Sequence, residues 1–497
     1  MKDNRTYYPD KTYLEETDFY EFTAGNALIS SNNDMIVEYD VFFRKAPWNG
    51  GYAIFAGLNH AIDFISNSEF LNNSRLSSFL NGKNQVQLEY PIFIRSIKEG
   101  SIVFPNEPIL SIRGRNSTLM MLETPILSII NHESLIATKA HRITYGGMGL
   151  AYKRKIFEFG SRRAHGLGAA ANGAYAAYIG GITATSNVCT SEIYNIPVFG
   201  TMQHAFVQSF NTESEAFDKY TEFSIERNLP TILLIDTYDV YKGIKNAINT
   251  FKKYEEKLCH RFVDYGIRID SGDLAKLSKE MRRILDQEGF ERAIIVVSND
   301  LDEYLIDSLE KQDCKIDAYG VGTSLITAKG CSDFGGVYKL TAKYSNHTRS
   351  DVFSKDYEPV IKCSENIDKT TIPGPKEVFS IYKKDEGSLH YIADIIFLLD
   401  EFVHPENMKE FFAFDLKTNV RYKIKLVSEK TMLVRKTSEE ICIGEAGPYY
   451  INHDRYSVQE IRMNSEKESE NYNNLYFVQL AGLLKIRMSN LLRYLFL

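Results

Sequence analysis

The sequence lacks the features that mark several large classes of protein. Its six cysteines are scattered without a CxxC or CxH spacing, which argues against a disulfide framework or a structural zinc site. No apolar run approaches the roughly 18 residues that a membrane-spanning helix needs. The polar start, MKDNRTYYPDKTY, contains no apolar signal region. We therefore expect a reduced, cytoplasmic, soluble protein without a membrane partner.

The chain also lacks an excess of positive charge. Its formal net charge is −7 and its pI is about 5.9, whereas a nucleic-acid-binding domain is normally basic. The GxGxxG fingerprint is absent, which argues against a dinucleotide-binding fold. At 497 residues the chain exceeds one typical core, so two or three domains are expected.

The order of apolar segments predicts three regions. Residues 1–145 combine a helix over 20–30, a strand over 36–44 and an amphipathic helix over 122–143, which indicates an N-terminal α+β domain. Residues 146–345 contain apolar runs that end in polar or glycine-rich tips and alternate with helical stretches. Parallel strands joined by helices are expected here, and their number favours a closed α/β barrel. We expect residues 346–497 to return to the N-terminal layer and to form a C-terminal subdomain. The predicted strand runs lie at 155–166, 178–187, 196–204, 231–239, 265–273, 293–300, 316–324 and 335–340.

Three of these strand tips are acidic, and barrels place their chemistry at strand C-termini. The pairs are Asp236 with Asp239, Asp270 with Asp273, and Asp300 with Asp302. For any single tip, capping of the following helix is the more common role of an acid. Three such tips together suggest contacts with a divalent cation and with a hydroxyl-rich ligand.

Arginines and glycines follow other strands of the series. Arg162 and Arg163 come after one strand, and Arg268 lies beside Asp270 on another. Guanidinium groups in these places either bind carboxylate or phosphate oxygens of a ligand or form salt bridges with the acidic tips. The segment GVGTS (320–324) precedes a helical stretch, so it forms either an anion site of backbone amides or a tight turn.

His204 follows the run PVFGTMQ and is a candidate base, phosphoryl acceptor, metal ligand or packed side chain. Its place at a strand tip opposite acids and arginines favours a chemical role. No metal-ligand spacing includes it, which ranks ligation below proton transfer and phosphoryl acceptance. Asp236 is one carboxylate that could hold its imidazole in one tautomer.

Ordered motifs over residues 10–385 resemble one family. TDFYEFTAG (17–25), GSRRAHG (160–166), GTMQHAF (200–206), RIDSGDL (268–274), VGTSL (321–325) and GGVYKL (335–340) occur in the order found in nicotinate phosphoribosyltransferases. The resemblance implies the irregular α/β barrel of type II phosphoribosyltransferases, with an N-terminal α+β layer and a C-terminal extension. It also implies a homodimer with shared active sites.

The implied reaction joins nicotinate to 5-phosphoribosyl-1-diphosphate, giving nicotinate mononucleotide and diphosphate in NAD salvage. ATP is the implied co-substrate, Mg²⁺ the implied cofactor and His204 the implied phosphohistidine, which would place the enzyme among the ATP-dependent ligases. The resemblance assigns catalysis to His204, Asp270 and Asp236. It assigns substrate contacts to Tyr20 from the partner subunit and to Phe159, Arg163, Thr201, Arg268, Ser271, Gly272, Gly322 and Thr323. It identifies no metal ligands.

The base and the activity have alternatives. Nicotinamide-using relatives carry an acid in the stretch that matches Thr185-Ser186-Asn187, and its absence here favours nicotinate. Quinolinate, with a second carboxylate, should require more cations, and a binding barrel without catalysis would not need His204. Two departures from the family pattern are Ala205, where a serine often follows the histidine, and a diverged region after about residue 400.

Overall fold

The structure is a computed structural model of the chain. It describes residues 16–462 with gaps at 68–78, 146–153, 260–263, 345–354, 363–368 and 400–409, and shorter gaps within 81–90, 386–387, 416–430 and 445–458; beyond these it describes Glu466 and Leu484–Ile486. The chain forms two compact units. The first contains Ile136–Ser332, and the second contains Tyr8–Leu135 and Asp333–Leu497. The domain boundaries at 145 and 345 stay predictions.

The first unit is built on a curled sheet of six parallel strands in the order β7-β6-β11-β10-β9-β8. This half-barrel confirms the expected irregular α/β barrel. Among the described strands, hydrogen bonds do not join β7 back to β8, so the expected closed ring is not formed. The strands are β6 (Lys155–Glu158), β7 (Ala184–Thr185), β8 (Thr231–Leu234), β9 (Tyr265–Ile269), β10 (Ile294–Ser298) and β11 (Ala318–Val321).

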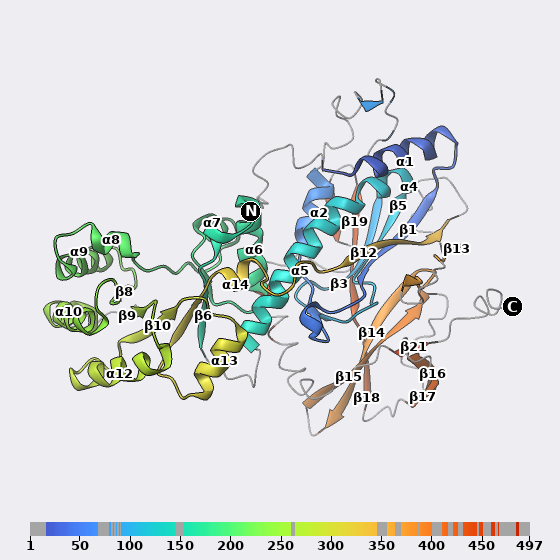
Figure 1. Ribbon diagram of the computed structural model, residues 1–497. Helices are drawn as coiled ribbons and strands as arrows, with labels where there is room; N and C mark the ends of the chain where they lie inside the picture. Colours follow the sequence, from blue (N-terminus) through green and yellow to red (C-terminus); the bar gives the residue numbers. More distant parts are fainter. Residues whose placement is uncertain are drawn as a thin grey trace. The chain divides into compact units, whose positions relative to one another are not determined.

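Helices α10, α12 and α13 lie along the outside of strands β8, β9 and β10 (Figure 1). The helices of the first unit are α6 (Leu167–Ile179), α7 (Val188–Tyr194), α8 (His204–Gln208), α9 (Glu213–Glu226), α10 (Val240–Lys253), α11 (Glu255–Cys259), α12 (Leu274–Gln287), α13 (Glu303–Lys311) and α14 (Thr323–Ile326), with a 3₁₀ turn, η4, at Ser161–Arg163. Among the described residues, no helix combines the length and hydropathy needed to cross a membrane.

The interior of the half-barrel is aromatic and aliphatic. The rings of Phe157 and Phe199 stack with centroids 3.9 Å apart, and Phe159 packs against the same cluster. Phe157 and Phe159 are two residues apart, and side chains alternate between the faces of a strand, so both face inward. The other buried members are Ala184, Ile232, Val296 and Ala318.

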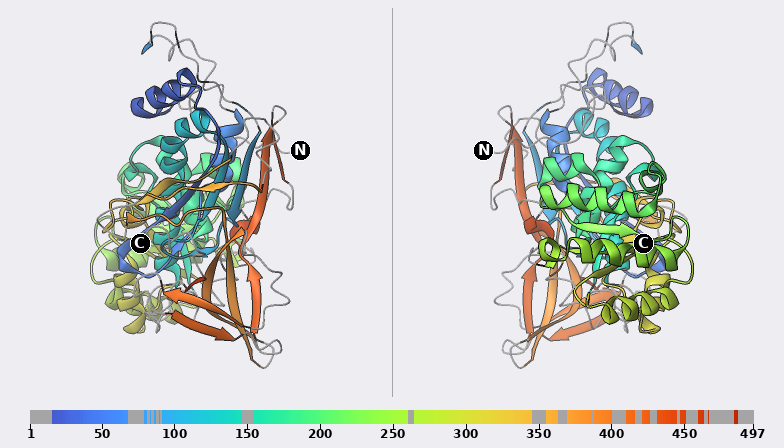
Figure 2. Two further views of the ribbon diagram at one scale, coloured as in Figure 1. Left: turned by 90° about the vertical axis from the view of Figure 1, so that its right-hand side faces the viewer. Right: turned by 90° about the vertical axis from the view of Figure 1, so that its left-hand side faces the viewer.

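The second unit contains a seven-stranded antiparallel sheet in the order β13-β12-β1-β5-β3-β19-β20 and a six-stranded sheet in the order β17-β16-β21-β15-β14-β18. Figure 2 shows the orange strands of the six-stranded sheet as a layer distinct from the blue strands of the N-terminal region. The strands of the first sheet are β1 (Ile36–Phe43), β3 (Ile92–Ile97), β5 (Leu110–Arg115), β12 (Gly336–Lys343), β13 (Glu358–Pro359), β19 (Thr437–Gly444) and β20 (Gly447–Tyr450). Those of the second are β14 (Lys376–Asp385), β15 (Ser388–Leu398), β16 (Glu410–Asp415), β17 (Arg421–Lys425), β18 (Thr431–Arg435) and β21 (Leu484–Ile486), and a separate pair joins β2 (Ala53–Ile54) to β4 (Ile102–Val103).

Helices of the second unit match the sequence-based expectations closely. The helix expected over 20–30 is α1 (Phe19–Ser30), and the one expected over 122–143 is α5 (Glu123–Tyr145), which begins in the second unit and ends in the first. The remaining elements are α2 (Leu58–Asn67), α4 (Asn116–Met121) and the 3₁₀ turn η2 (Pro47–Asn49).

Two strand predictions were wrong. GGVYKL was expected to continue the barrel series, but it forms β12, which pairs antiparallel with β1 in the other unit. The run 196–204 was expected to be a strand, but it makes one isolated bridge, between Val198 and Thr185. Pro197 has no N–H to donate to a neighbouring strand. The pairing therefore consists of Thr185 N donating to the Pro197 carbonyl and Phe199 N donating to the Thr185 carbonyl.

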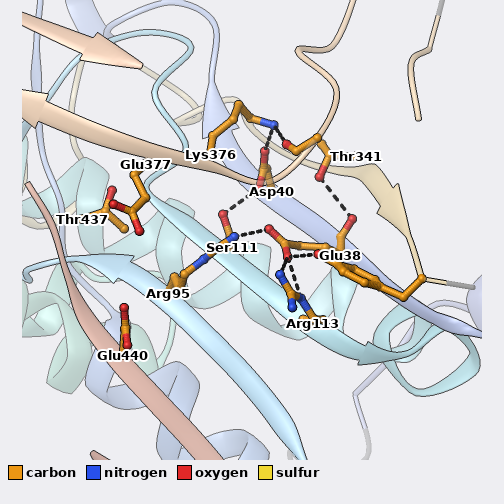
Figure 3. Close-up of polar contacts among 12 residues, drawn as sticks. Glu38, Asp40, Arg95, Ser111, Arg113, Thr341, Lys376, Glu377, Thr437 and Glu440 are labelled. Atoms are coloured by element: carbon orange, nitrogen blue, oxygen red, sulfur yellow. Dashed lines mark hydrogen bonds and ion pairs between the residues drawn. The ribbon is translucent and has the colours of Figure 1, made fainter. Parts of the chain in front are cut away.

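A buried ionic network joins the strands of the second unit (Figure 3). Glu38 on β1 pairs with Arg95 and Arg113 from β3 and β5, and Asp40 pairs with Lys376 of β14 at 2.7 Å. Burial alone would raise the pKa of Glu38, but the two guanidinium charges outweigh it and hold that pKa below its usual value. The network therefore holds three N-terminal strands and the C-terminal strand β14 together through paired charges.

Candidate active site

Arg268, at the end of β9, organises a polar cluster at the C-terminal edge of the half-barrel. Its Nη2 donates to Asp270 Oδ1 at 2.7 Å, its Nε to Ser298 Oγ at 2.8 Å and its Nη1 to Thr201 Oγ1 at 3.0 Å. The guanidinium carbon lies 5.9 Å from the ring centre of Phe159. The structure thus brings four of the predicted residues, Phe159, Thr201, Arg268 and Asp270, into one cluster.

Asp270 is held as an acceptor in this cluster. Its Oδ1 accepts from Arg268 and from the Ser298 hydroxyl, and its backbone N–H donates to Asp236 Oδ2 at 2.8 Å. Burial would raise the pKa of Asp270, but the Arg268 charge, the Ser298 hydrogen bond and His204 together lower it. Asp270 therefore presents a negative charge at the site across the neutral pH range.

His204 lies beside this carboxylate at the first position of α8. Its Nε2 is 3.6 Å from Asp270 Oδ2, and its Nδ1 is 3.1 Å from the hydroxyl oxygen of Thr237. The imidazole is 43% exposed, which leaves it accessible to a ligand. The expectation that Asp236 orients the histidine is not supported by these contacts, because Thr237 and Asp270 contact the ring.

One carboxylate oxygen of Asp236 accepts no hydrogen bond from the described residues. Its Oδ2 takes the Asp270 N–H and the Ser271 hydroxyl at 2.6 Å, while its Oδ1 is buried without a hydrogen-bond partner in the described part of the chain. Gly272 follows with a φ of 82°, a left-handed conformation that favours glycine. A buried carboxylate oxygen without a donor is suited to a ligand hydroxyl or a cation.

The acidic pairs separate into two roles. Asp239, Asp273 and Asp302 cap α10, α12 and α13, with side-chain oxygens accepting from backbone N–H groups of the first turn. The first acids of two pairs, Asp236 and Asp270, meet at the site. The capping role is therefore confirmed for Asp239, Asp273 and Asp302, and ligand contact by Asp236 and Asp270 stays a prediction.

Arg163 lies against the glycine turn before α14. A Cβ on Gly322 would stand 1.7 Å from Arg163 Nη2, so only glycine leaves room for this guanidinium. Arg163 Nη2 donates to the Phe159 carbonyl at 3.2 Å, and its Nε is buried without a partner among the described residues. Thr323 begins α14 directly after this turn, whereas Arg162 is exposed. An unpaired N–H beside a glycine turn can donate a hydrogen bond to an anionic ligand group.

Tyr20 lies on α1, in the second unit. Its side chain is 60% exposed and its hydroxyl donates to Glu21 at 3.2 Å. Partial burial and the nearby acids Glu123 and Glu21 raise the pKa of Tyr20 to about 12. The ring is therefore a neutral, accessible aromatic surface.

Three site residues were missed by the sequence interpretation: Ser298, Thr237 and Glu158. Ser298 ends the run AIIVVS and Thr237 follows Asp236 in the TILLIDT run, so both stand at strand tips whose distinctive residues are acids. Glu158 ends β6 one residue before Phe159. The sequence signal for the first two is a hydroxyl at a strand end, which does not distinguish them from other serines and threonines.

Known proteins are similar to this chain over most of its length. The nicotinate phosphoribosyltransferase (NAPRTase) N-terminal domain matches residues 16–131, and the nicotinate phosphoribosyltransferase (NAPRTase) family matches residues 154–404. Nicotinate phosphoribosyltransferase of Bacillus subtilis (strain 168) is 40% identical over 416 residues, which are 82% of this chain and 80% of that protein. The Caenorhabditis elegans protein of the same name is 32% identical over 454 residues, covering 78% and 76% of the two chains.

A solved structure shares the fold. The crystal structure of human nicotinic acid phosphoribosyltransferase superposes with a TM-score of 0.74 at 20% identity, covering 97% of this chain and 100% of that one. The matched domains and the curated relatives establish the family: the chain belongs to the nicotinate phosphoribosyltransferases.

Proposed function

We propose that this protein is a nicotinate phosphoribosyltransferase that forms nicotinate mononucleotide in NAD salvage. The pyridine nitrogen of nicotinate bonds to C1 of 5-phosphoribosyl-1-diphosphate. The bond from C1 to the diphosphate oxygen breaks, and its electron pair leaves with diphosphate. The observation that carries the proposal is the Arg268–Asp270–Ser298 cluster beside Phe159 at the edge of the half-barrel.

The residues of the cluster suit each part of the substrates. Phe159 offers a flat apolar face for the pyridine ring, and Arg163 offers its unpaired Nε to the nicotinate carboxylate or a phosphate. Asp270 accepts from ribose hydroxyls, and its charge favours the positive carbon that develops at C1. Ser271, Gly272, Gly322 and Thr323 are the proposed contacts of the ribose and 5-phosphate groups, and Thr201 holds Arg268 in place.

Mg²⁺ is the proposed cofactor, and the residues fit it in part. The described residues contain no group of three or more His, Cys, Asp or Glu side chains placed to hold a metal ion. The unpartnered Asp236 Oδ1 and the neighbouring Asp270 are two carboxylates, which matches the usual Mg²⁺ site of one or two carboxylates completed by substrate phosphates. When bound, the ion neutralises charge on the departing diphosphate.

ATP coupling through a phosphohistidine at His204 is the finer part of the proposal, and it would place the enzyme among the ATP-dependent ligases. The exposed imidazole, oriented by Thr237 and Asp270, is the support for it. Purified protein with nicotinate, 5-phosphoribosyl-1-diphosphate and Mg²⁺ should release diphosphate, and faster when ATP is added. His204→Ala should lose the ATP stimulation and keep slow ATP-independent turnover. An ATP-stimulated variant would show that His204 is not the acceptor, and no product in the wild type would refute the activity.

A homodimer with shared active sites is the third part. Its support is the exposed Tyr20 ring, which suits stacking on a pyridine ring from a partner subunit. Tyr20→Ala and His204→Ala proteins, each impaired alone, should regain about a quarter of wild-type activity when unfolded, mixed and refolded together, because half of the dimers then hold one intact site. Absence of any recovery, with dimers formed, would refute the sharing of sites.

Nicotinamide is the competing base. Thr185-Ser186-Asn187 carries no charge, and Asn187 caps α7 through its side chain, accepting from Thr190 N at 3.0 Å. No acid is present in this stretch to accept from an amide nitrogen, which supports nicotinate. Turnover measured side by side with nicotinate, nicotinamide and quinolinate distinguishes the three bases.

A further inference from the structure

Glu158 is a fully buried acid at the end of β6, directly between the inward-facing Phe157 and Phe159. Strand alternation places its side chain on the opposite face from those rings, behind the interior of the half-barrel. A carboxylate in such a position is destabilising through lost hydration unless donors compensate for it. The hydrogen-bond donors around Glu158 therefore show which parts of the chain its side chain holds together.

These donors come from two segments that are distant in sequence. One carboxylate oxygen accepts from the backbone N–H of Gly160, with a further contribution from Ser161 N–H, and the other accepts from Thr185 Oγ1 at 2.6 Å. The Glu158 backbone carbonyl also accepts from Ser186 N at 2.9 Å. Glu158 thus binds the turn after β6 and the end of β7 at the same time.

Further hydrogen bonds extend this link. The Thr185 hydroxyl accepts from Asn187 N at 3.0 Å, and the Asn187 side chain donates to Ser161 Oγ at 3.2 Å. Hydrogen bonds therefore run from Gly160 through Glu158, Thr185 and Asn187 to Ser161, and they hold the turn that carries Arg163 against the uncharged stretch 185–187. The Thr185 oxygen accepts the Asn187 N–H through a lone pair, so the hydroxyl hydrogen of Thr185 remains available to donate to Glu158.

We propose that Glu158 is a positioning residue for base recognition, which holds the Phe159–Arg163 turn and the Thr185–Asn187 stretch at the spacing that nicotinate requires. The inference rests on the proposed function, which assigns nicotinate to these two segments. Glu158 does not touch the substrate in this role. It acts through Arg163 on one side and through Thr185 on the other.

Glu158→Gln tests the role with almost no change of shape. The glutamine oxygen can still accept from Gly160, but its amide nitrogen cannot accept the Thr185 hydrogen, so the bond from the Thr185 hydroxyl to a charged carboxylate is lost. The Ser186–Glu158 backbone bond and the Asn187–Ser161 bond remain. We expect the KM for nicotinate to rise about tenfold, the size of one lost bond to a charged group. The KM for 5-phosphoribosyl-1-diphosphate and kcat should each stay within twofold of the wild-type value. Thr185→Val should have a similar effect, and the double variant should be little worse than either single variant.

Asp317→Asn is the matched control. Asp317 lies just before β11, at the other end of the same sheet, and its carboxylate likewise accepts a backbone N–H, from Ile295 at 2.8 Å. This variant should leave both KM values unchanged. If Glu158→Gln lowers kcat and the unfolding temperature but leaves the KM for nicotinate unchanged, the residue is only structural and the proposal is overturned.

Arg163→Ala separates failure of the inference from failure of the proposed site. If this variant raises the KM for nicotinate and Glu158→Gln does not, the positioning role alone is refuted. If Arg163→Ala leaves the KM for nicotinate unchanged, the proposed base site is wrong, and the role of Glu158 is overturned with it.

Discussion

The stability of the second unit should fall as the pH rises, because of one buried acid. Glu99 is 3% exposed and accepts from the N–H groups of Gly57 at 2.6 Å and Asn59 at 3.2 Å, at the start of α2. Burial and the neighbouring Glu133 raise the pKa of Glu99 from 4.5 to about 7, although His60 and the backbone donors oppose the shift. The folded unit therefore binds a proton more tightly than the unfolded chain.

The direction and size of the effect follow from this difference. Below pH 4.5 the acid is protonated in both states, and its stabilising contribution is complete. That contribution is lost as the pH rises through about 7, because ionisation is then costly only in the folded state. At about 1.4 kcal/mol per pKa unit, the loss is roughly 3 kcal/mol between pH 4.5 and pH 8.

The chain provides its own probe for the measurement. Its single tryptophan, Trp48, lies in the same unit as Glu99, so its fluorescence during urea unfolding reports on this unit. The decrease in unfolding free energy from pH 5 to pH 8 should be roughly 2.5 kcal/mol smaller in Glu99→Gln than in wild type. The exposed Glu226→Gln serves as the control and should keep the wild-type slope. Equal slopes in Glu99→Gln and wild type would refute the reasoning.

Three other substitutions have defined outcomes. Arg268→Lys loses the forked contacts of the guanidinium and should lower kcat/KM on the order of a hundredfold in a diphosphate-release assay, with unchanged urea unfolding. Glu38→Gln leaves buried arginines without their full charge partner (Figure 3) and should lower the unfolding free energy by about 3 kcal/mol near pH 7, measured by tryptophan fluorescence. The pKa of Glu38 is lowered in the folded state, so this stabilisation is complete above the ordinary value of 4.5 and should be lost as the pH falls from there through the lower folded-state pKa. Gly322→Ala should displace Arg163 and raise the KM for nicotinate about tenfold, whereas Gly168→Ala, where a Cβ meets nothing within 4 Å, should not change it.

The sequence predicts elements better than it predicts their partners. The helix expected over 20–30 is α1, and its start is marked by a capping box of Asp18 and Glu21, which is a local property of the chain. The segment GGVYKL was correctly expected to be a strand, but it was assigned to the wrong sheet. Its partner, β1, lies about three hundred residues earlier, and the choice between a parallel and an antiparallel neighbour depends on those distant residues.

The same limit applies to the site. Arg268 and Asp270 were found because charged groups at strand tips stand out against apolar runs. Ser298 was missed although its hydroxyl bonds to both of them. A serine at a strand end has no distinctive pattern, and its role appears only when β9 and β10 are placed side by side.

Two acids of the half-barrel show why residue type alone does not identify a catalytic group. Asp270 and Glu158 both stand at the ends of strands, and both are removed from water to a large extent. Burial would raise the pKa of each carboxyl, but the Arg268 charge reverses the shift at Asp270, whereas hydrogen bonds and a more distant Arg163 offset it only in part at Glu158, whose pKa stays raised. Asp270 faces the exposed His204 and remains ionised where substrate charge develops, whereas Glu158 lies behind the sheet with its acceptors occupied by Gly160 and Thr185. The donors around each carboxylate, and the face of the sheet on which it lies, therefore separate the acid proposed for catalysis from the one proposed for positioning.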